Sequence, residues 1–174
     1  MRILKRNNYH EFNIRRARLE DAAGIHEAHM QSIREVCSKD HSPEEIQGWG
    51  NRPFNEENRH NAIKNHCLWV VESDDKIEGY GHLQIYERDG VSLAHVHGLY
   101  LTPKALSKNN GRKLVSKMIE EASKAAVVTI KLEATLTAHS FYQKMGFADS
   151  APMKTVEIGG SKVSCYPMTM ELNP

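Results

Sequence analysis

The chain has 174 residues, of which 23 are Lys or Arg and 22 are Asp or Glu, so its formal net charge is +1. Its length and its 40% hydrophobic content predict one domain with a core of its own. A charge so near zero favours neither a nucleic acid nor an anionic membrane as a partner. The longest apolar runs, residues 68–71 and 125–128, are far shorter than the ~18 residues that a membrane-spanning helix needs.

The three cysteines, Cys37, Cys67 and Cys165, are sparse and widely spaced. An odd cysteine count of this kind is typical of reduced thiols, so we expect a cytoplasmic protein. The basic N-terminus is followed by no apolar segment, which argues against a secretory signal. No Cys-x-x-Cys pair and no His/Cys spacing indicates zinc, and we expect no metal.

The first half of the chain predicts a strand followed by helices. Residues 1–11 read as a polar arm, and residues 12–174 as a single domain. Apolar side chains alternate over 12–17, which predicts a strand, and recur at helical spacing over 19–37. Ser42, Pro43 and Glu45 have the spacing of an N-cap, a first helical residue and a capping-box partner. Asn55 begins another short helix, which we expect to reach residue 65.

The second half is dominated by strands. Residues 67–72, 77–86 and 91–101 predict an antiparallel meander that ends at Pro103, with turns at 74–75 and 88–90. An apolar stripe predicts a helix from Gly111, followed by a buried strand over 127–132. A short helix over 137–145 should end at Gly146, and two strands should flank residues 159–160. This order predicts an α+β domain built around a mostly antiparallel sheet.

A polar loop joins the third strand of the meander to the helix that begins at Gly111. The free N–H groups and the dipole of a helix N-terminus form an anion site. Such a loop suits a phosphate-bearing ligand, but it is equally compatible with an ordinary polar loop and a solvated basic helix start. The basic residues around it are Lys104, Lys108, Arg112 and Lys113.

Two sequence motifs favour the phosphate-binding interpretation of this loop over an ordinary polar loop. Residues 99–103, Leu-Tyr-Leu-Thr-Pro, resemble the strand half of the acetyl-CoA-binding motif of the GNAT superfamily of N-acetyltransferases. Residues 138–147 are similar to the Ala-x-x-Phe-Tyr-x-x-x-Gly-Phe helix and cap of the same family, and residues 14–22 look like its first strand and helix. The resemblance extends over residues 12–172.

The resemblance implies a GNAT-like sheet of about seven strands flanked by helices, with a splayed parallel pair. That pair would be the strand ending near Leu101 and the strand from Val127. The pantetheine arm of acetyl-CoA would lie in the gap, and its pyrophosphate would bind the N–H groups of residues 108–111. The residues that the resemblance assigns to the coenzyme are Leu99, Tyr100, Leu101, Leu106, Ser107, Lys108, Asn109, Asn110, Gly111, Arg112, Thr137, Ser140 and Tyr142.

The phosphate loop departs from the family pattern at two positions. Leu106 stands where Gln or Arg is usual, and Asn109 replaces the first Gly, whereas Gly111 keeps the second. Asn is the non-Gly residue that best tolerates left-handed dihedral angles, so it is able to preserve the shape of the loop. These departures motivate the alternative of a CoA-binding sensor or interaction module without catalysis.

Acetyl transfer requires a general acid and a general base. Tyr142 matches the family's Tyr and, as a phenol with a pKa near ~10, suits donation to a departing thiolate; its alternative role is packing against the sheet. His95 and His97 are two residues apart on a strand, so both should point to one face, and His suits proton removal near neutral pH. Glu133 is a third candidate base. The two histidines are alternatively hydrogen-bonded sheet residues, or metal ligands that lack a third partner.

We therefore expect an N-acetyltransferase that acts on an amine of a small molecule or peptide, as a monomer or homodimer. Direct attack in a ternary complex is favoured because no Cys lies near either motif in the sequence. A purely structural partner protein is the remaining alternative. The acceptor pocket is expected between the first helices and the last hairpin, where acidic groups would suit a cationic amine; its candidate residues are Glu27, His29, Glu35, Trp49 and Tyr166.

Overall fold

The computed structural model describes residues 11–172, and a sheet of eight strands runs through this part of the chain. The strand order is β1-β2-β3-β4-β5-β8-β6, with β7 paired to β8 outside this path. All paired neighbours are antiparallel except β4 and β5. The strands are β1 (Asn13–Arg16), β2 (Cys67–Ser73), β3 (Lys76–Arg88), β4 (Val91–Leu101), β5 (Thr129–Thr135), β6 (Ala148–Asp149), β7 (Lys154–Ile158) and β8 (Ser161–Glu171).

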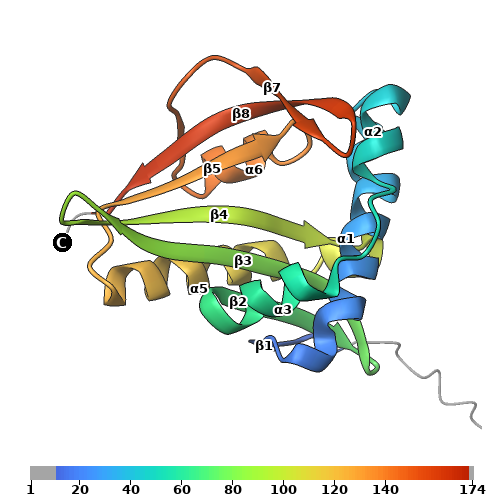
Figure 1. The fold of residues 1–174 in the computed structure, drawn as a ribbon, viewed down its shortest axis with the longest axis horizontal. Helices are drawn as coiled ribbons and strands as arrows, with labels where there is room; N and C mark the ends of the chain where they lie inside the picture. The colour runs from blue at the N-terminus through green and yellow to red at the C-terminus, as the bar shows by residue number, and fades with distance from the viewer. Residues whose placement is uncertain (1–10, 173–174) are drawn as a thin grey trace, which may run out of the picture.

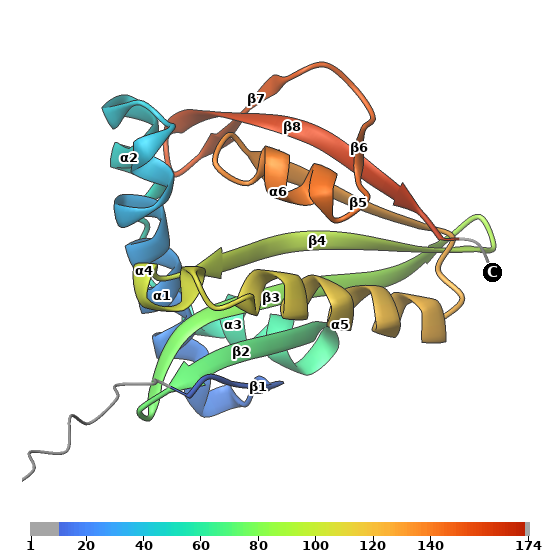
Figure 2. The same cartoon turned by 180° about the vertical axis from the view of Figure 1, so that it is seen from behind.

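Helices cover both faces of this sheet. α3 lies in front of β2 and β3, with α1 and α2 at the end of the sheet (Figure 1), while α5 and α6 lie on the opposite face (Figure 2). The mostly antiparallel sheet with one parallel pair is confirmed, and β6 is the strand that the sequence pattern did not predict. The helices are α1 (Ala22–Glu35), α2 (Pro43–Trp49), α3 (Glu56–Asn65), α4 (Pro103–Leu106), α5 (Asn110–Lys124) and α6 (His139–Lys144).

Side-chain N-caps stabilise the first turns of α2 and α3, as the sequence predicts. Ser42 accepts from the N–H of Glu45 at 3.3 Å, and the Glu45 carboxylate accepts from the N–H of Ser42 at 2.8 Å, which confirms the capping box. The Asn55 side chain accepts from the N–H of Asn58 at 2.9 Å. Pro103 does end β4, but it also begins α4, a turn of helix that the sequence analysis took as loop.

The main core lies between the sheet and α5. The buried face of α5 carries Leu114, Val115 and Met118, as its apolar stripe predicts. A Cβ at Gly81 would lie 2.4 Å from the terminal carbon of Met118, so glycine lets the helix approach β3 closely. A separate cluster on the other face joins α1 and α3 to β2 and β3. Val96 and Leu101 of β4 belong to the first cluster and Tyr100 packs against the second, so both faces of β4 are held in place near the site described below.

The parallel strands β4 and β5 diverge. They pair only from Leu93 with Thr129 to Val96 with Leu132, although β4 continues to Leu101 and β5 to Thr135. Beyond Val96, β4 keeps its hydrogen bonds to β3, after a bulge at His97. The splayed pair expected from the family resemblance is therefore present, and it opens toward α1, as the two ribbons show in Figure 1.

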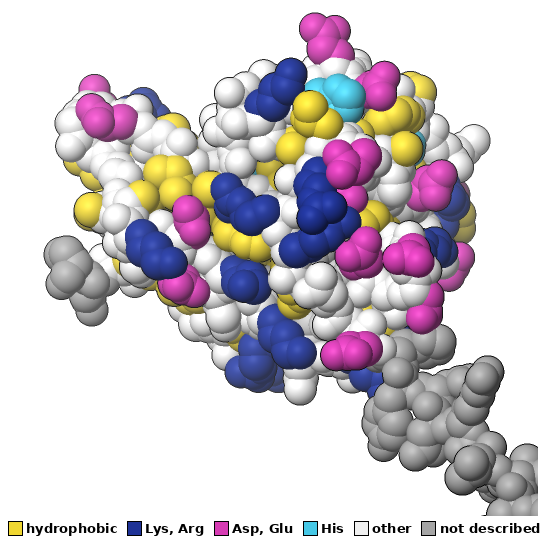
Figure 3. Space-filling model, turned by 90° about the horizontal axis from the view of Figure 1, so that it is seen from below, with side chains coloured by type: hydrophobic (Ala, Val, Ile, Leu, Met, Phe, Trp, Pro, Cys, Tyr) yellow, Lys and Arg dark blue, Asp and Glu magenta, His cyan; other side chains and the backbone are white. Residues whose placement is uncertain are grey.

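The outer surface carries charges of both signs. In the view from below, Lys and Arg side chains share the surface with Asp and Glu (Figure 3). No helix within residues 11–172 is long and apolar enough to cross a membrane. The expected polar arm, residues 1–11, lies almost wholly outside the described residues.

Candidate acyl-transfer site

The loop between α4 and α5 presents a helix N-terminus that its own side chains leave open. Asn109, the residue before α5, has φ +58° and ψ 12°, the left-handed conformation that Asn tolerates, and makes no side-chain cap. The first N–H groups of α5 are therefore left for a ligand. Gly111 follows, where a Cβ would lie 3.3 Å from the ring of Phe141. This geometry fits a diphosphate, with the exposed Arg112 beside it.

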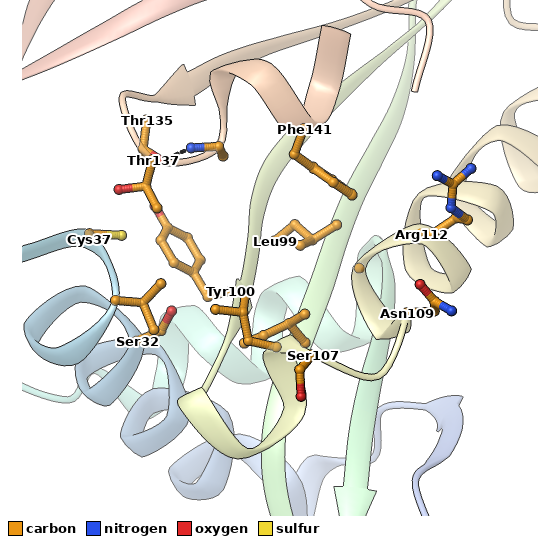
Figure 4. Close-up of a pocket in the computed structure, with 15 residues that line it drawn as sticks. Ser32, Cys37, Leu99, Tyr100, Ser107, Asn109, Arg112, Thr135, Thr137 and Phe141 are labelled. Carbon is orange, nitrogen blue, oxygen red and sulfur yellow. Dashed lines mark hydrogen bonds between the residues drawn. The ribbon is translucent and has the colours of Figure 1, made fainter. Parts of the chain in front are cut away.

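A cavity of about 430 Å³ begins at this loop and runs along the open end of β4 (Figure 4). Its volume is within the usual range for a small-molecule site. α1 closes one end, and the segment between β5 and α6 forms the opposite wall. The lining residues are Ser32, Val36, Cys37, Leu99, Tyr100, Leu101, Leu106, Ser107, Asn109, Gly111, Arg112, Thr135, Thr137, Ala138 and Phe141.

A narrow extension of about 30 Å³ lies deeper, between the splayed strands. Leu99, Tyr100, Thr135 and Ala138 line both spaces, so the extension adjoins the cavity. Three of the four predicted catalytic residues, His97, Glu133 and Tyr142, line this extension. Its lining residues are Val96, His97, Gly98, Leu99, Tyr100, Leu132, Glu133, Thr135, Ala138 and Tyr142.

Tyr142 is held in this extension by aromatic packing. Its ring meets Phe141 and Phe147 edge to face, and the side chain is 5% exposed. Burial raises the pKa of Tyr142 above its ordinary value, so the phenol keeps its proton at neutral pH. A protonated hydroxyl here is able to donate to a leaving group.

The predicted base His97 belongs to a row of histidines. Its Nε2 lies 2.7 Å from Oε1 of Gln84, and its ring centroid is 4.7 Å from those of both His82 and His95. Desolvation lowers the pKa of His97 to about 4 and that of His82 to about 3. His66, at the end of α3, continues the row through a 2.8 Å contact between its Nδ1 and Nε2 of His82. The lowered pKa values keep the imidazoles of His66, His82 and His97 neutral at pH 7.

His95 is paired differently from His97. Its Nε2 lies 3.2 Å from a carboxylate oxygen of Glu133, whose other oxygen accepts from Lys154, also at 3.2 Å. The hydrogen bond from His95 is the main cause that lowers the pKa of Glu133 to about 2. A carboxylate with this pKa binds a proton weakly, so Glu133 is a poorer base than His97.

The comparisons with known proteins agree with this geometry. A family model described as an acetyltransferase (GNAT) domain matches residues 37–172. The chain belongs to the GNAT acetyltransferase family. No protein in the curated set matches the sequence.

Solved GNAT structures share the fold at low sequence identity. A GCN5-related N-acetyltransferase from Rhodopseudomonas palustris has a TM-score of 0.78 at 20% identity, covering 92% of this chain and 95% of its own. PaiA N-acetyltransferase from Thermoplasma acidophilum, in complex with coenzyme A, has 0.70 at 20% identity, covering 93% and 99%. YncA, a putative acetyltransferase from Salmonella typhimurium with acetyl-CoA, has 0.68 at 20% identity, covering 94% and 95%.

The structure separates the coenzyme residues expected from the GNAT resemblance into two groups. Nine of them, Leu99, Tyr100, Leu101, Leu106, Ser107, Asn109, Gly111, Arg112 and Thr137, line the cavity, and Tyr142 lines its extension. Three do not line either space: Lys108 and Ser140 are exposed, and the buried Asn110 side chain donates to the carbonyl of Ala105 at 2.9 Å. Asn110 thus braces α4 against α5 with its side chain.

Nothing in the sequence indicated a cysteine at the site, but the structure places Cys37 there. Cys37 is remote from both GNAT motifs in the chain, yet the end of α1 lies across the gap between β4 and β5. Cys37 therefore lies in the cavity wall near Thr135 and Thr137 (Figure 4). Burial raises the pKa of the Cys37 thiol to about 12. The thiol is therefore protonated at neutral pH and a weak nucleophile.

The expected acidic acceptor pocket is not formed by the residues proposed for it. Glu27 and Glu35 are exposed on α1, and Tyr166 stacks on His139 at 3.8 Å, beside α6. His29 and Trp49 are buried and do face the space between α1, α2 and β4, where both contact Tyr100. Among residues 11–172, no group of three or more His, Cys, Asp or Glu side chains has the arrangement of a metal site.

Proposed function

We propose that the protein is an N-acetyltransferase that moves the acetyl group of acetyl-CoA directly to an amine of a small molecule or peptide. One observation carries this proposal: the cavity at the open N-terminus of α5 adjoins the extension lined by Tyr142 and His97, and the two share four lining residues. A ligand with a diphosphate at one end and a thioester at the other matches this arrangement.

The coenzyme would be held mainly by backbone groups. Its diphosphate would accept from the N–H groups at the start of α5, with Arg112 adding charge. Its pantetheine arm would lie against β4 over Leu99–Leu101, on the side where β5 no longer pairs. N–H groups on that side would also stabilise the oxyanion that develops on the thioester carbonyl.

Gln84 fixes the tautomer of the proposed base. Its amide oxygen accepts, so Nε2 of His97 carries the hydrogen and Nδ1 has a free lone pair. The acceptor nitrogen would form a bond to the thioester carbon and lose a proton to Nδ1 of His97. The C–S bond then breaks, and the sulfur takes the hydroxyl proton of Tyr142. Return of one proton from His97 to Tyr142 through solvent restores both groups.

Within residues 11–172, Cys37 is the one cysteine that lines the cavity, so it would be the nucleophile of a covalent route. Its protonated thiol argues for direct transfer, which requires no acetyl-enzyme. Incubation with labelled acetyl-CoA in the absence of an amine tests this. We expect no stoichiometric label on the wild-type protein; a label that is lost in Cys37→Ala would establish an acetyl-thioester intermediate instead.

The second candidate, a CoA-binding module without turnover, is favoured by Leu106. This apolar side chain stands where the family usually has a polar residue, and it is 48% exposed at the rim of the cavity. Calorimetry with acetyl-CoA, followed by an amine panel, separates the two functions. Binding with turnover supports the enzyme, binding without turnover on any amine supports the module, and no binding contradicts both.

A further inference from the structure

Two arginines lie beside the buried pair His29 and Tyr80 without an acidic partner. Arg52 follows α2 and Arg59 lies on α3; within residues 11–172 neither guanidinium forms an ion pair with a carboxylate. Both side chains are half-buried. A half-buried guanidinium that no carboxylate neutralises is well suited to bind an anion.

Both arginines converge on one pair of buried side chains. The guanidinium of Arg52 lies 3.4 Å from Nε2 of His29, and that of Arg59 lies over the ring of Tyr80, 5.1 Å from its centroid. His29 and Tyr80 are themselves joined by a 3.0 Å hydrogen bond between Nδ1 and the hydroxyl. The two positive charges also lower the pKa of His29, in addition to the effect of its burial. The guanidiniums therefore act on one region from two sides.

This region is directly connected to the reacting end of β4. A Cβ built on Gly98 would lie 2.8 Å from the Tyr80 hydroxyl, so that hydroxyl touches the backbone next to the His97 bulge. The ring of Tyr100, which lines the cavity, lies 4.1 Å from the ring of His29. His29 and Tyr80 are themselves buried, whereas Arg52 and Arg59 are partly exposed beside them. An acceptor whose amine reaches His97 would therefore extend past this buried pair to the two arginines.

Acidic side chains are scarce around this path. Glu27 is near enough to influence His26 but is exposed on α1, and Glu133 is already paired with His95 and Lys154. Glu56 and Glu57 lie in the first turn of α3, but both are exposed, and Glu56 is 3.8 Å from His60. The neutral histidines of the His66–His97 row add no negative charge. The electrostatic character of the path is therefore positive at its outer end.

We propose that the acceptor is an amine that also carries an anionic group, a carboxylate or a phosphate, bound between Arg52 and Arg59. This inference rests on the acetyltransferase function proposed above and names its substrate class. Arg is the residue best suited to such a group, because its planar fork donates two parallel hydrogen bonds to carboxylate or phosphate oxygens. The amine would approach His97 while the anion fixes its orientation.

Matched acceptor pairs test the proposal with little change in amine basicity. γ-Aminobutyrate and ε-aminocaproate are each compared with the corresponding amide, and phosphoethanolamine is compared with ethanolamine, so that carboxylate and phosphate are distinguished. We expect kcat/KM to be about tenfold or more higher for the anionic member of at least one pair. Arg52→Gln and Arg59→Gln should each reduce that preference, whereas Arg88→Gln, at the exposed end of β3, should not.

The outcomes separate this inference from the function on which it rests. Turnover with equal or better use of the neutral members, or a preference unaffected by both Arg variants, would overturn the anionic acceptor while leaving the acetyltransferase intact. A second measurement does not need turnover: calorimetric titration of glutarate into the CoA-loaded protein. Binding of glutarate that Arg52→Gln and Arg59→Gln weaken, and no binding of glutaramide, would support the anion site even if no amine were acetylated; absence of glutarate binding would count against it.

Discussion

The buried imidazole of His41 accepts a hydrogen bond from the backbone N–H of Leu136 at 3.1 Å. Its other nitrogen, Nδ1, lies 3.1 Å from the carboxylate of Glu45, which also accepts from the N–H of Ser164 at 2.7 Å. His41 therefore ties the start of α2 to the segment between β5 and α6. Because Thr135 and Thr137 flank Leu136 and line the cavity, His41 sets the position of the cavity wall.

Two substitutions at His41 test this positioning role. Gln can keep an acceptor near the place of Nε2, whereas Asn can keep only the contact near Nδ1. We expect His41→Asn to leave the Leu136 N–H unsatisfied and to lower the free energy of unfolding by about 1–3 kcal/mol, with a higher KM for acetyl-CoA. His41→Gln should recover much of both. Denaturant titration and steady-state kinetics measure the two effects, and equal behaviour of the variants would contradict the role.

Tyr142→Phe removes only the proposed acid. The ring remains packed between Phe141 and Phe147, so stability and coenzyme binding should change little. Turnover should fall by about 10²–10⁴-fold, the usual contribution of a general acid. Calorimetry with acetyl-CoA provides the binding control. Turnover equal to that of the wild type would remove Tyr142 from the chemistry.

The proposed base should titrate at low pH. Because desolvation lowers the pKa of His97 to about 4, the acidic limb of kcat/KM should lie near pH 4 rather than near the ordinary histidine value of 6.5. The acceptor amine also titrates, so the assay should use an amine of low pKa, whose titration does not mask the acidic limb that His97 causes. His97→Ala should remove the limb and His95→Ala should retain it. The reverse pattern would transfer the role of base to His95.

His82 makes stability depend on pH. Its pKa is about 3 in the fold and near 6.5 in the unfolded chain, so between these values unfolding takes up a proton. The contribution of neutral His82 to the free energy of unfolding is complete above pH 6.5. As the pH falls below that value, the free energy of unfolding decreases by up to about 1.4 kcal/mol per pH unit. Denaturant titrations from pH 7 to pH 5 should show a smaller slope for His82→Gln than for the wild type. His60→Gln, in α3, is the matched control for the loss of a histidine.

Asn109 tests the left-handed start of the phosphate loop. Asn109→Gly should keep the loop and bind acetyl-CoA at least as tightly, because glycine adopts φ +58° without strain. Asn109→Val should destabilise the fold by about 1–3 kcal/mol, since a β-branched residue is strained there, and weaken binding. Calorimetry and denaturant titration measure both. Tight binding by the Val variant would show that the loop shape is not required.

Much of the fold was predictable because its signals are local. The capping box at Ser42 and Glu45, the apolar stripe of α5 and the left-handed end of α6 at Gly146 all depend on residues close together in the chain. The opening of α4 at Pro103 was missed because the residue that ends a strand is equally suited to begin a helix.

The site was less predictable because several segments meet there. His66, His82 and His97 come from the end of α3, from β3 and from β4, and only the sheet register places them in one row. Cys37 reaches the cavity because of the path of α1, which nothing in the two GNAT motifs encodes. The acidic acceptor pocket was expected from the charges on α1. Glu27 and Glu35, however, lie on the exposed side of that helix.

A crystal structure of the protein with acetyl-CoA tests the central claim most directly. The account predicts the diphosphate on the N–H groups at the start of α5 and the thioester between β4 and β5, within hydrogen-bond reach of the Tyr142 hydroxyl. A coenzyme bound outside the cavity, or with its thioester turned away from the extension that Tyr142 and His97 line, would contradict it.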